Sequence, residues 1–498
     1  MSPLPADELT ALADAALSAA AGCQAAELRI ERVRSQVVRL HDAQPETTAD
    51  GTDFGMGVRV VHDGAVGFAA SVDVRPEEAA HLVAQAREMA RVTRQAGGGR
   101  VELAPEPSHG EVTWTSEFEV DPSTVPASDK IALLAEWSRR LGEHEVAAHT
   151  SASLLAVSEQ TYLADLNGTR ATQQRVRLQC QLEALALSES GFETMRTIAP
   201  PVGRGWEYLT GPTSAGNWDW DGEVDRIPEL LAEKLAAPSV EAGTYDLVVD
   251  PSNLWLTIHE SIGHATELDR AVGYEAAYAG TSFATFDQLD RLRYGSPVMH
   301  ITGDRTIEHG LATIGIDDEG VEGQSFDLVR DGILVGYQLD RSIAASMGFA
   351  RSNGCAFADS PMHVPIQRMA NVSLAHAGDD GPTTEDLIAG VERGIYVVGD
   401  KSWSIDMQRY NFQFTGQRFY RIENGKLAGQ LKDVAYQATT TDFWGAMEAV
   451  GGASTWVLGG AFNCGKGQPG QVAPVSHGCP AVLVRGVNVL NARAESGR

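Results

Sequence analysis

The sequence predicts an α+β protein whose first half mixes helices with an antiparallel sheet and whose second half is β-rich. In residues 1–240, long segments of helical period alternate with segments in which apolar and polar residues alternate. Beyond residue 295, short apolar runs are separated by turns that contain glycine, which is typical of strands. We therefore expect an N-terminal α+β region with long helices, followed by a β-rich region with one functional helix near its start.

The first hundred residues predict the order helix, strands, hairpin, helix. Residues 6–21 have a helical period, and the alternation in residues 26–40 predicts a pair of strands. An Asp-Gly pair divides residues 56–71 into two alternating runs, which is a strong hairpin signal. Residues 76–96 begin with proline and two acids and keep a helical period, so they predict a second long helix.

The middle of the chain continues the mixed pattern. Three glycines at 97–99 predict a linker, and residues 127–143 predict a helix. Residues 149–190 alternate as long antiparallel strands would, and another helix is expected near 224–236. A second linker is predicted at 237–243, directly before the β-rich half.

The C-terminal half begins with a buried strand, TYDLVVD, and later has an Asp-Gly hairpin turn within SFDLVRDGILVGYQLD. A chain of 498 residues is longer than one hydrophobic core usually spans, so more than one domain is expected. We predict an N-terminal α+β region at 1–240, which could divide into 1–100 and 101–240. The β-rich region is predicted at 241–498.

Composition and charge exclude several classes of protein. The chain has 67 acidic and 39 basic residues, a net charge of −28, which opposes binding to nucleic acid or to anionic membranes. The N-terminus has no basic segment before its apolar residues, and no run of about 18 apolar residues follows, so neither a signal peptide nor a membrane span is expected. The odd number of scattered cysteines favours reduced thiols and a cytoplasmic location: Cys23, Cys180, Cys355, Cys464 and Cys479.

The segment HESIGH contains His259, Glu260 and His264, one residue longer than the zinc-binding pattern H-E-x-x-H. On a regular α-helix, residues five apart are separated by about 140°, too far for both imidazoles to reach one metal. Either a π-bulge takes up the extra residue, or the helix ends and His264 approaches from a loop. We favour the bulge, because the segment has no proline and keeps helical character to Leu268, and Gly263 eases the distortion.

A metal site needs a third protein ligand and an open position for water. The glycine-rich segment 459–480 offers Cys464, His477 and Cys479. A thiolate in this polar segment would be balanced by Zn²⁺. From the spacing alone, a metal site and two core histidines remain equally open.

Seven segments, in order between residues 245 and 490, resemble the TldD/PmbA family of metalloproteases. The likeness is more diffuse in the N-terminal half, where the order of elements also fits. In this family, TldD-like chains carry H-E-x-x-x-H and a later cysteine, whereas PmbA-like or TldE-like partners lack the ligands. Both features are present here, so the chain resembles the catalytic subunit. The segments are HESIGHATELD, IDDEG (316–320), DLVRDGILVGYQLDRSIAASMG, SNGCAFA (352–358), RMANV (368–372), YRIENGKL (420–427) and NCGKGQPGQ (463–471).

The resemblance implies a zinc peptidase that hydrolyses small or unfolded peptides in the catalytic region 241–498. It assigns the Zn²⁺ ligands to His259, His264 and Cys464, and makes Glu260 the general base for a metal-activated water. It leaves His477 and Cys479 outside the ligand set, as wall or packing residues. It also implies a heterodimer with a PmbA/TldE-like partner, although a homodimer stays open.

Several alternatives remain at this point. The chain could be a non-catalytic binding or regulatory subunit, or a zinc hydrolase acting on an amide of a biosynthetic intermediate. Glu267 and Asp269 could orient a ligand imidazole or be surface carboxylates. The acids Asp317 to Glu319 could hold a substrate amine or a loop, or could end a strand. An exposed strand edge in the β-rich half would suit an extended peptide.

Overall fold

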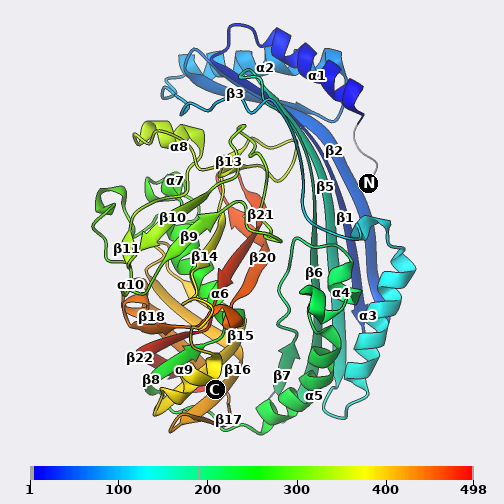
Figure 1. The fold of residues 1–498 in the computed structure, drawn as a ribbon. Helices are drawn as coiled ribbons and strands as arrows, with labels where there is room; N and C mark the ends of the chain where they lie inside the picture. The colour runs from blue at the N-terminus through cyan, green and yellow to red at the C-terminus, as the bar shows by residue number, and fades with distance from the viewer. Residues whose placement is uncertain (1–4, 189–190, 496–498) are drawn as a thin grey trace.

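The computed structural model describes residues 5–188 and 191–495, and it confirms the predicted α+β class. Figure 1 shows a long, twisted sheet on one side of the molecule and a β-rich body packed against its inner face. No helix in the described residues is long and apolar enough to cross a membrane. The first sheet is N-terminal, and the second body holds every strand from β8 onward.

The N-terminal sheet has seven strands in the order β3-β2-β1-β5-β6-β4, with β7 also paired to β6. Its four central strands are 17 to 19 residues long, so one sheet extends along the whole molecule. The strands are β1 (Ala25–His41), β2 (Gln44–His62), β3 (Ala65–Ser71), β4 (Glu111–Thr115), β5 (His149–Asp165), β6 (Arg170–Ser188) and β7 (Gly191–Arg196).

Helices cover the outer face of this sheet at its two ends (Figure 1). The apolar faces of α1 and α2 pack on β1–β3, and those of α3 and α5 pack on β5 and β6, giving two separate cores. This matches an amphipathic helix, which must bury one stripe. The helices are α1 (Ala6–Ala19), α2 (Pro76–Gln95), α3 (Ala127–Gly142), α4 (Glu207–Thr210) and α5 (Trp220–Ala236).

One strand prediction was wrong. Residues 26–40 form part of the single strand β1 instead of a pair, because the segment contains no glycine, proline, asparagine or aspartate at which the chain could turn. The predicted hairpin is confirmed: β2 and β3 are joined by Asp63 and Gly64, whose φ angles are 51° and 72°. Asp331 and Gly332 likewise join β10 to β11 with positive φ.

The largest core lies in the β-rich body. There, β15, β8, β22, β18 and β16 pair in sequence, and β15 pairs again with β16, so these five strands close into a ring. The site-bearing helix α6 (Pro251–Ile258) packs against β15, β20 and β21. The ring strands are β8 (Gly243–Val249), β15 (Arg393–Ile405), β16 (Asn411–Glu423), β18 (Val434–Thr439) and β22 (Val482–Asn491).

Smaller elements surround the ring. A four-stranded sheet contains β9 (Ile301–Asp304), β10 (Ser325–Arg330), β11 (Ile333–Leu334) and β14 (Asn371–Leu374). Two strand pairs are β12 (Ala356–Phe357) with β13 (Ile366–Gln367), and β20 (Val457–Lys466) with β21 (Gln471–Cys479). The other elements are β17 (Lys426–Leu431), β19 (Met447–Val450), α7 (Leu268–Ala271), α8 (Arg341–Ser346), α9 (Thr384–Ala389), α10 (Thr440–Gly445) and α11 (Ala492–Glu495).

Buried ion pairs join the N-terminal sheet to the β-rich body. Arg59 on β2 pairs with Glu27 on β1 and with Glu319 in the IDDEG segment. Asp317 accepts backbone N–H groups of Val321 (2.9 Å) and Ala356 (3.0 Å). The acids of IDDEG therefore hold a loop and the junction with the sheet.

Candidate metal centre

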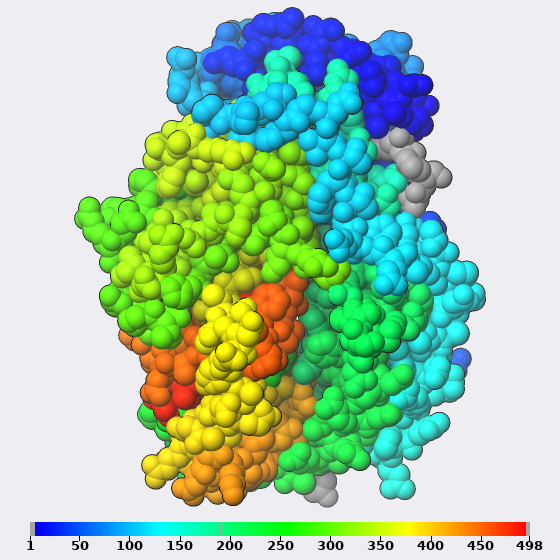
Figure 2. Space-filling view, in the orientation of Figure 1, coloured from blue at the N-terminus to red at the C-terminus, as the bar shows by residue number. Residues whose placement is uncertain are grey.

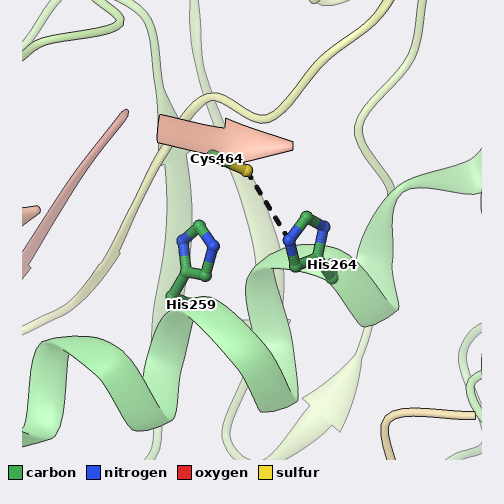
Figure 3. A group of neighbouring side chains, drawn as sticks. All are labelled: His259, His264 and Cys464. Atoms are coloured by element: carbon green, nitrogen blue, oxygen red, sulfur yellow. Dashed lines mark hydrogen bonds between the residues drawn. The ribbon is translucent and has the colours of Figure 1, made fainter. Parts of the chain in front are cut away.

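The helix α6 leads directly into a π-helical turn, His259–Gly263. A π-turn contains one more residue than an α-turn, so it brings residue i+5 back toward the face of residue i. The imidazoles of His259 and His264 consequently face one another, with ring centroids 4.8 Å apart (Figure 3). The predicted bulge between the two histidines is present.

Side chains from other segments satisfy the carbonyl groups of this irregular turn. The hydroxyl of Tyr294 donates to the Ser261 carbonyl (2.5 Å), and the Gln338 amide donates to the Gly263 carbonyl (2.7 Å). Unpaired buried carbonyls would be costly, so these bonds stabilise the wide turn. Gly263 is needed for space, because a Cβ there would lie 2.5 Å from the sulfur of Met369.

The structure brings the three predicted ligands together. His259 and His264 come from the turn, and Cys464 comes from β20, about two hundred residues later in the chain (Figure 3). One ligand atom from each lies within 4.8 Å of the other two, and all three residues are buried. The Cys464 Sγ is 3.6 Å from His264 Nε2. Their role as metal ligands remains a prediction.

Hydrogen bonds determine which imidazole nitrogen faces this centre. The Nδ1 of His264 donates to the Glu267 carboxylate (2.8 Å), so its Nε2 faces Cys464. His477 donates from Nδ1 to the Val372 carbonyl (2.9 Å), which leaves its Nε2 as an acceptor for Nδ1 of His259 (2.7 Å). Both candidate ligands therefore keep Nε2 available for a metal.

His477 has a larger part in the site than its interpretation as a wall residue suggested. It is fully buried, bonds His259 directly and stacks on Trp255 with an interplanar angle of 13°. Pairing of β20 with β21 in an antiparallel hairpin brings it back beside the cleft, opposite Gly459. The turn-like sequence KGQPGQ between two alternating runs was the available signal. Cys479 instead packs with its sulfur 3.6 Å from the Pro251 carbonyl.

At this centre, the protonation states of Cys464 and His264 depend on each other. Burial acts to raise the pKa of Cys464, but the neighbouring His264 and His259 hold that pKa well below its usual value. Burial acts to lower the pKa of His264, but the charge and hydrogen bond of Cys464 and the charge of Glu267 together outweigh it and raise the pKa to about 9. The metal-free site therefore favours a thiolate beside an imidazolium, and the thiolate is the form that binds metals.

A second layer of charge supports the ligands. Lys466, two residues after Cys464 on β20, is buried and donates to Glu267 (3.1 Å) and Asp269 (2.7 Å). Both carboxylates are buried, so the surface interpretation was wrong for both. Glu267 contacts a ligand candidate, His264, whereas Asp269 acts on Lys466.

Glu260 lies in the same cavity as the three ligand candidates. Burial acts to raise its pKa, but His259, His264 and Arg409 together lower it, so the carboxylate is ionised. Arg409 forms an ion pair with Glu260 and comes from the turn between β15 and β16, where its φ is 63°. Sequence alone gave no sign of Arg409, because its contact with Glu260 depends on the tertiary fold.

A cleft of about 540 Å³ gives access to this group. One wall is formed by α6 and β20, and the facing wall by residues 179–181 of β6 and by residues 196–201, which begin at the last residue of β7. In Figure 2 the surface is hollowed between the orange residues of the β20–β21 segment and the green residues of the N-terminal region. The candidate centre therefore lies between the two bodies of the fold.

Comparison with known proteins gives two matches to family models. The PmbA/TldA metallopeptidase C-terminal domain matches residues 242–491, and PmbA/TldA metallopeptidase domain 1 matches residues 26–90. A metalloprotease of Synechocystis sp. is 28% identical over 93% of this chain and 94% of its own length. A metalloprotease TldD homolog of Haemophilus influenzae is 27% identical over 88% of this chain and 86% of its own length.

Solved structures share the fold at low sequence identity. TldE from Thermococcus kodakarensis has a TM-score of 0.72 at 16% identity, covering 96% of this chain and 99% of that chain. A structure from Bacteroides thetaiotaomicron, titled a putative modulator of DNA gyrase, has a TM-score of 0.71 at 17% identity, covering 97% and 98%. At these identities the likeness concerns the fold.

Proposed function

Because the chain belongs to the TldD/PmbA family of metalloproteases, we propose that it is a zinc-dependent peptidase acting on small or unfolded peptides. The observation that carries this proposal is the convergence of two imidazole Nε2 atoms and one thiolate beside an ionised carboxylate. Two nitrogens and one sulfur suit Zn²⁺, and three protein ligands leave a fourth position open.

The side chains have distinct parts in this proposal. His259, His264 and Cys464 would hold the ion, which when bound supplies a Lewis acid that lowers the pKa of water and polarises a carbonyl group. Glu260 follows a ligand directly and acts as the general base: it accepts the proton of the attacking water and returns it to the leaving amine. Arg409 keeps Glu260 ionised and oriented until substrate enters.

The strand β20 offers a way to bind extended peptides of many sequences. Within the described part of the chain, β20 has one strand partner, β21, and its residues line the cleft. Backbone hydrogen bonds to such an edge do not depend on the side chains of the peptide. The facing wall leaves a narrow cleft, which supports a preference for unfolded peptides over folded proteins.

Assembly, location and domain division complete the proposal. A PmbA/TldE-like partner, or a second copy of this chain, would enclose the cleft, and the shared fold with TldE supports such a partnership. The reduced cysteines support a cytoplasmic location. The interval between α5 and β8 supports a division near residue 240, between the N-terminal region and the catalytic region 241–498.

Metal analysis tests the central claim. Wild type and Cys464→Ser are purified without added metal, and their metal content is measured together with hydrolysis of a panel of unstructured peptides. We expect one zinc per wild-type chain, little zinc in the variant, and hydrolysis only by wild type. A wild type that neither contains nor takes up zinc would reject the peptidase and favour the non-catalytic binding subunit.

A further inference from the structure

A second cavity, of about 630 Å³, lies beside the catalytic cleft. It is bounded by β7 and α5 from the N-terminal region and by β15, β16 and β17 from the β-rich body. Arg196 and Ile198 line both cavities. Asp250 lines the second cavity, while the next residues, Pro251 and Ser252, line the first, so the start of α6 separates the two.

The three carboxylates of the second cavity already accept hydrogen bonds from protein groups, Asp219 from the Gly222 N–H (3.1 Å). Asp250 accepts hydrogen bonds from Ser252 N–H (3.0 Å) and from the Tyr396 hydroxyl (2.5 Å). Glu223 accepts from Ile198 N–H and from the Trp218 indole, both at 2.6 Å. These acids hold the walls in place and have little capacity left to bind a cationic ligand.

Two arginines in the cavity have capacity left. Arg226 donates from Nε to the Gly222 carbonyl (3.0 Å), a backbone acceptor. The Nε of Arg418 is buried without a hydrogen-bond partner in the described structure. Both side chains line the cavity, and because the two Nε groups are shielded or already used, a ligand would meet the Nη ends of the guanidinium forks, whose planar donors match a carboxylate.

The remaining walls are mainly apolar and aromatic, with Thr213 and Asn217 as polar members. Tyr396 and Tyr420 stack with ring centroids 6.1 Å apart, and aliphatic side chains complete the cavity. A cavity that combines apolar walls with guanidinium donors suits an apolar group that carries a carboxylate. On a peptide, the residue that combines both is an apolar C-terminal residue with its free α-carboxylate.

We propose that the second cavity binds the C-terminal residue of the peptide substrate, with the α-carboxylate at Arg418 and Arg226 and an apolar side chain against the tyrosines. The inference rests on the proposed function, since it extends the same cleft. Arg196 and Ile198 line both cavities, so the two are adjacent, and in this proposal one extended peptide occupies both. The protein then selects peptides by their free C-terminus and cleaves at a distance set by the two cavities.

Binding to a catalytically silent protein tests this. Glu260→Gln protein loaded with zinc is titrated calorimetrically with two hexapeptides of identical sequence that end in phenylalanine, one with a free carboxylate and one amidated. We expect the amide to bind about 10-fold more weakly or worse, the loss typical of a hydrogen-bonded charged group. In the additional variant Arg418→Gln, the preference for the free carboxylate should fall sharply, with Arg226 left as the remaining cationic contact.

Matched variants keep the test decisive. Arg421→Gln removes an exposed arginine of the same strand that pairs with Glu423, and should preserve the preference for the free carboxylate. Arg226→Gln changes an exposed helix residue and should weaken the preference if Arg418→Gln fails to fold. Equal binding of the two peptides, or a preference that survives both Arg418→Gln and Arg226→Gln, would overturn the inference; in the second case the carboxylate binds elsewhere, for example at the metal.

The two proposals fail in different ways. If wild type hydrolyses no peptide but the silent protein still prefers the free carboxylate, the second cavity stands and the peptidase does not. If wild type hydrolyses the peptide with a free C-terminal carboxylate and the amidated peptide with the same KM, the peptidase stands and the C-terminal site does not.

Discussion

His259 and His264 have the same task in the proposed site but different supports. A carboxylate, Glu267, holds Nδ1 of His264, whereas a neutral imidazole, His477, holds Nδ1 of His259. Burial and the nearby His259 keep the pKa of His477 well below its ordinary value, so it stays an acceptor at neutral pH. The sequence predicted the ligands, but this pairing depends on a contact between residues 218 positions apart.

Substitution of His477 should weaken the centre through His259. In His477→Ala, Nδ1 of His259 loses its acceptor, and we expect zinc affinity to fall about 10–100-fold, measured by competition with a chelating dye. In His477→Gln, the amide can accept from His259 and donate to Val372, so part of the affinity should return. His376→Ala, at an exposed position, is the control. An unchanged affinity in His477→Ala would mean that His477 only fills space.

Substitution of Glu260 separates metal binding from catalysis. In Glu260→Gln the carboxylate that accepts the proton of water is lost, while the three ligand candidates are unchanged. We expect the zinc content of wild type and a kcat lower by about 10²–10⁴-fold, the usual share of a general base. Elemental analysis and peptide hydrolysis on the same preparation measure both. Full activity in this variant would remove Glu260 from the mechanism.

The thiolate–imidazolium pair predicts how zinc affinity depends on pH. The pKa of His264 in the metal-free protein is raised to about 9, so its Nε2 carries a proton at neutral pH. Zinc must displace that proton, so affinity should rise as pH increases toward 9 and then level off, by about tenfold per pH unit for one proton. In Cys464→Ser the charge that raises this pKa is absent, so the plateau should begin at lower pH. An affinity independent of pH between 6 and 9 would contradict the assignment.

At the scale of elements, the π-turn depends on close packing at one glycine. A Cβ on Gly263 would lie 2.5 Å from the Met369 sulfur, so Gly263→Ala forces Met369 and the turn apart. We expect the free energy of unfolding to fall by about 1–3 kcal/mol, the usual cost of overpacking, with a loss of bound zinc. Gly445→Ala, where an added Cβ meets nothing within 4 Å, is the control. Denaturant unfolding and metal analysis give both readings.

Sequence patterns predicted which helices and strands are present better than they predicted where each strand begins and ends. The two Asp-Gly hairpins, the long helices and the π-turn follow from local chemistry, namely turn residues, helical period and a histidine spacing that no regular helix accommodates. The single strand β1 was missed because a period of two looks the same in one long strand and in a pair. Arg409 and Lys466 were missed as site residues because only the tertiary fold brings them to Glu260 and Glu267.

At the scale of the whole molecule, buried charges hold the two bodies in the geometry that shapes the cleft. Arg59 is 6% exposed and binds Glu27 with two hydrogen bonds of 3.1 Å, as well as Glu319. In Arg59→Ala both carboxylates stay buried and keep only their contacts with Arg341, so we expect the free energy of unfolding to fall by about 3–5 kcal/mol. Arg75→Ala, which breaks an ion pair with Asp73 at the protein surface, should change stability little. If denaturant unfolding gave the same loss of stability for Arg59→Ala and Arg75→Ala, a structural role for the buried cluster would be contradicted.

The position of β20 also bears on solubility. A strand edge with unpaired backbone groups is a template for association with other chains, and proteins usually protect such edges with charge, proline or a covering segment. Here the edge lies within a cleft, in the wall that faces β6 and the segment after β7. A flexible single chain can reach it, but the rigid edge of another folded molecule cannot. The N-terminal sheet therefore lets the protein keep an open strand edge for short peptides while preventing that edge from pairing with other copies of the protein.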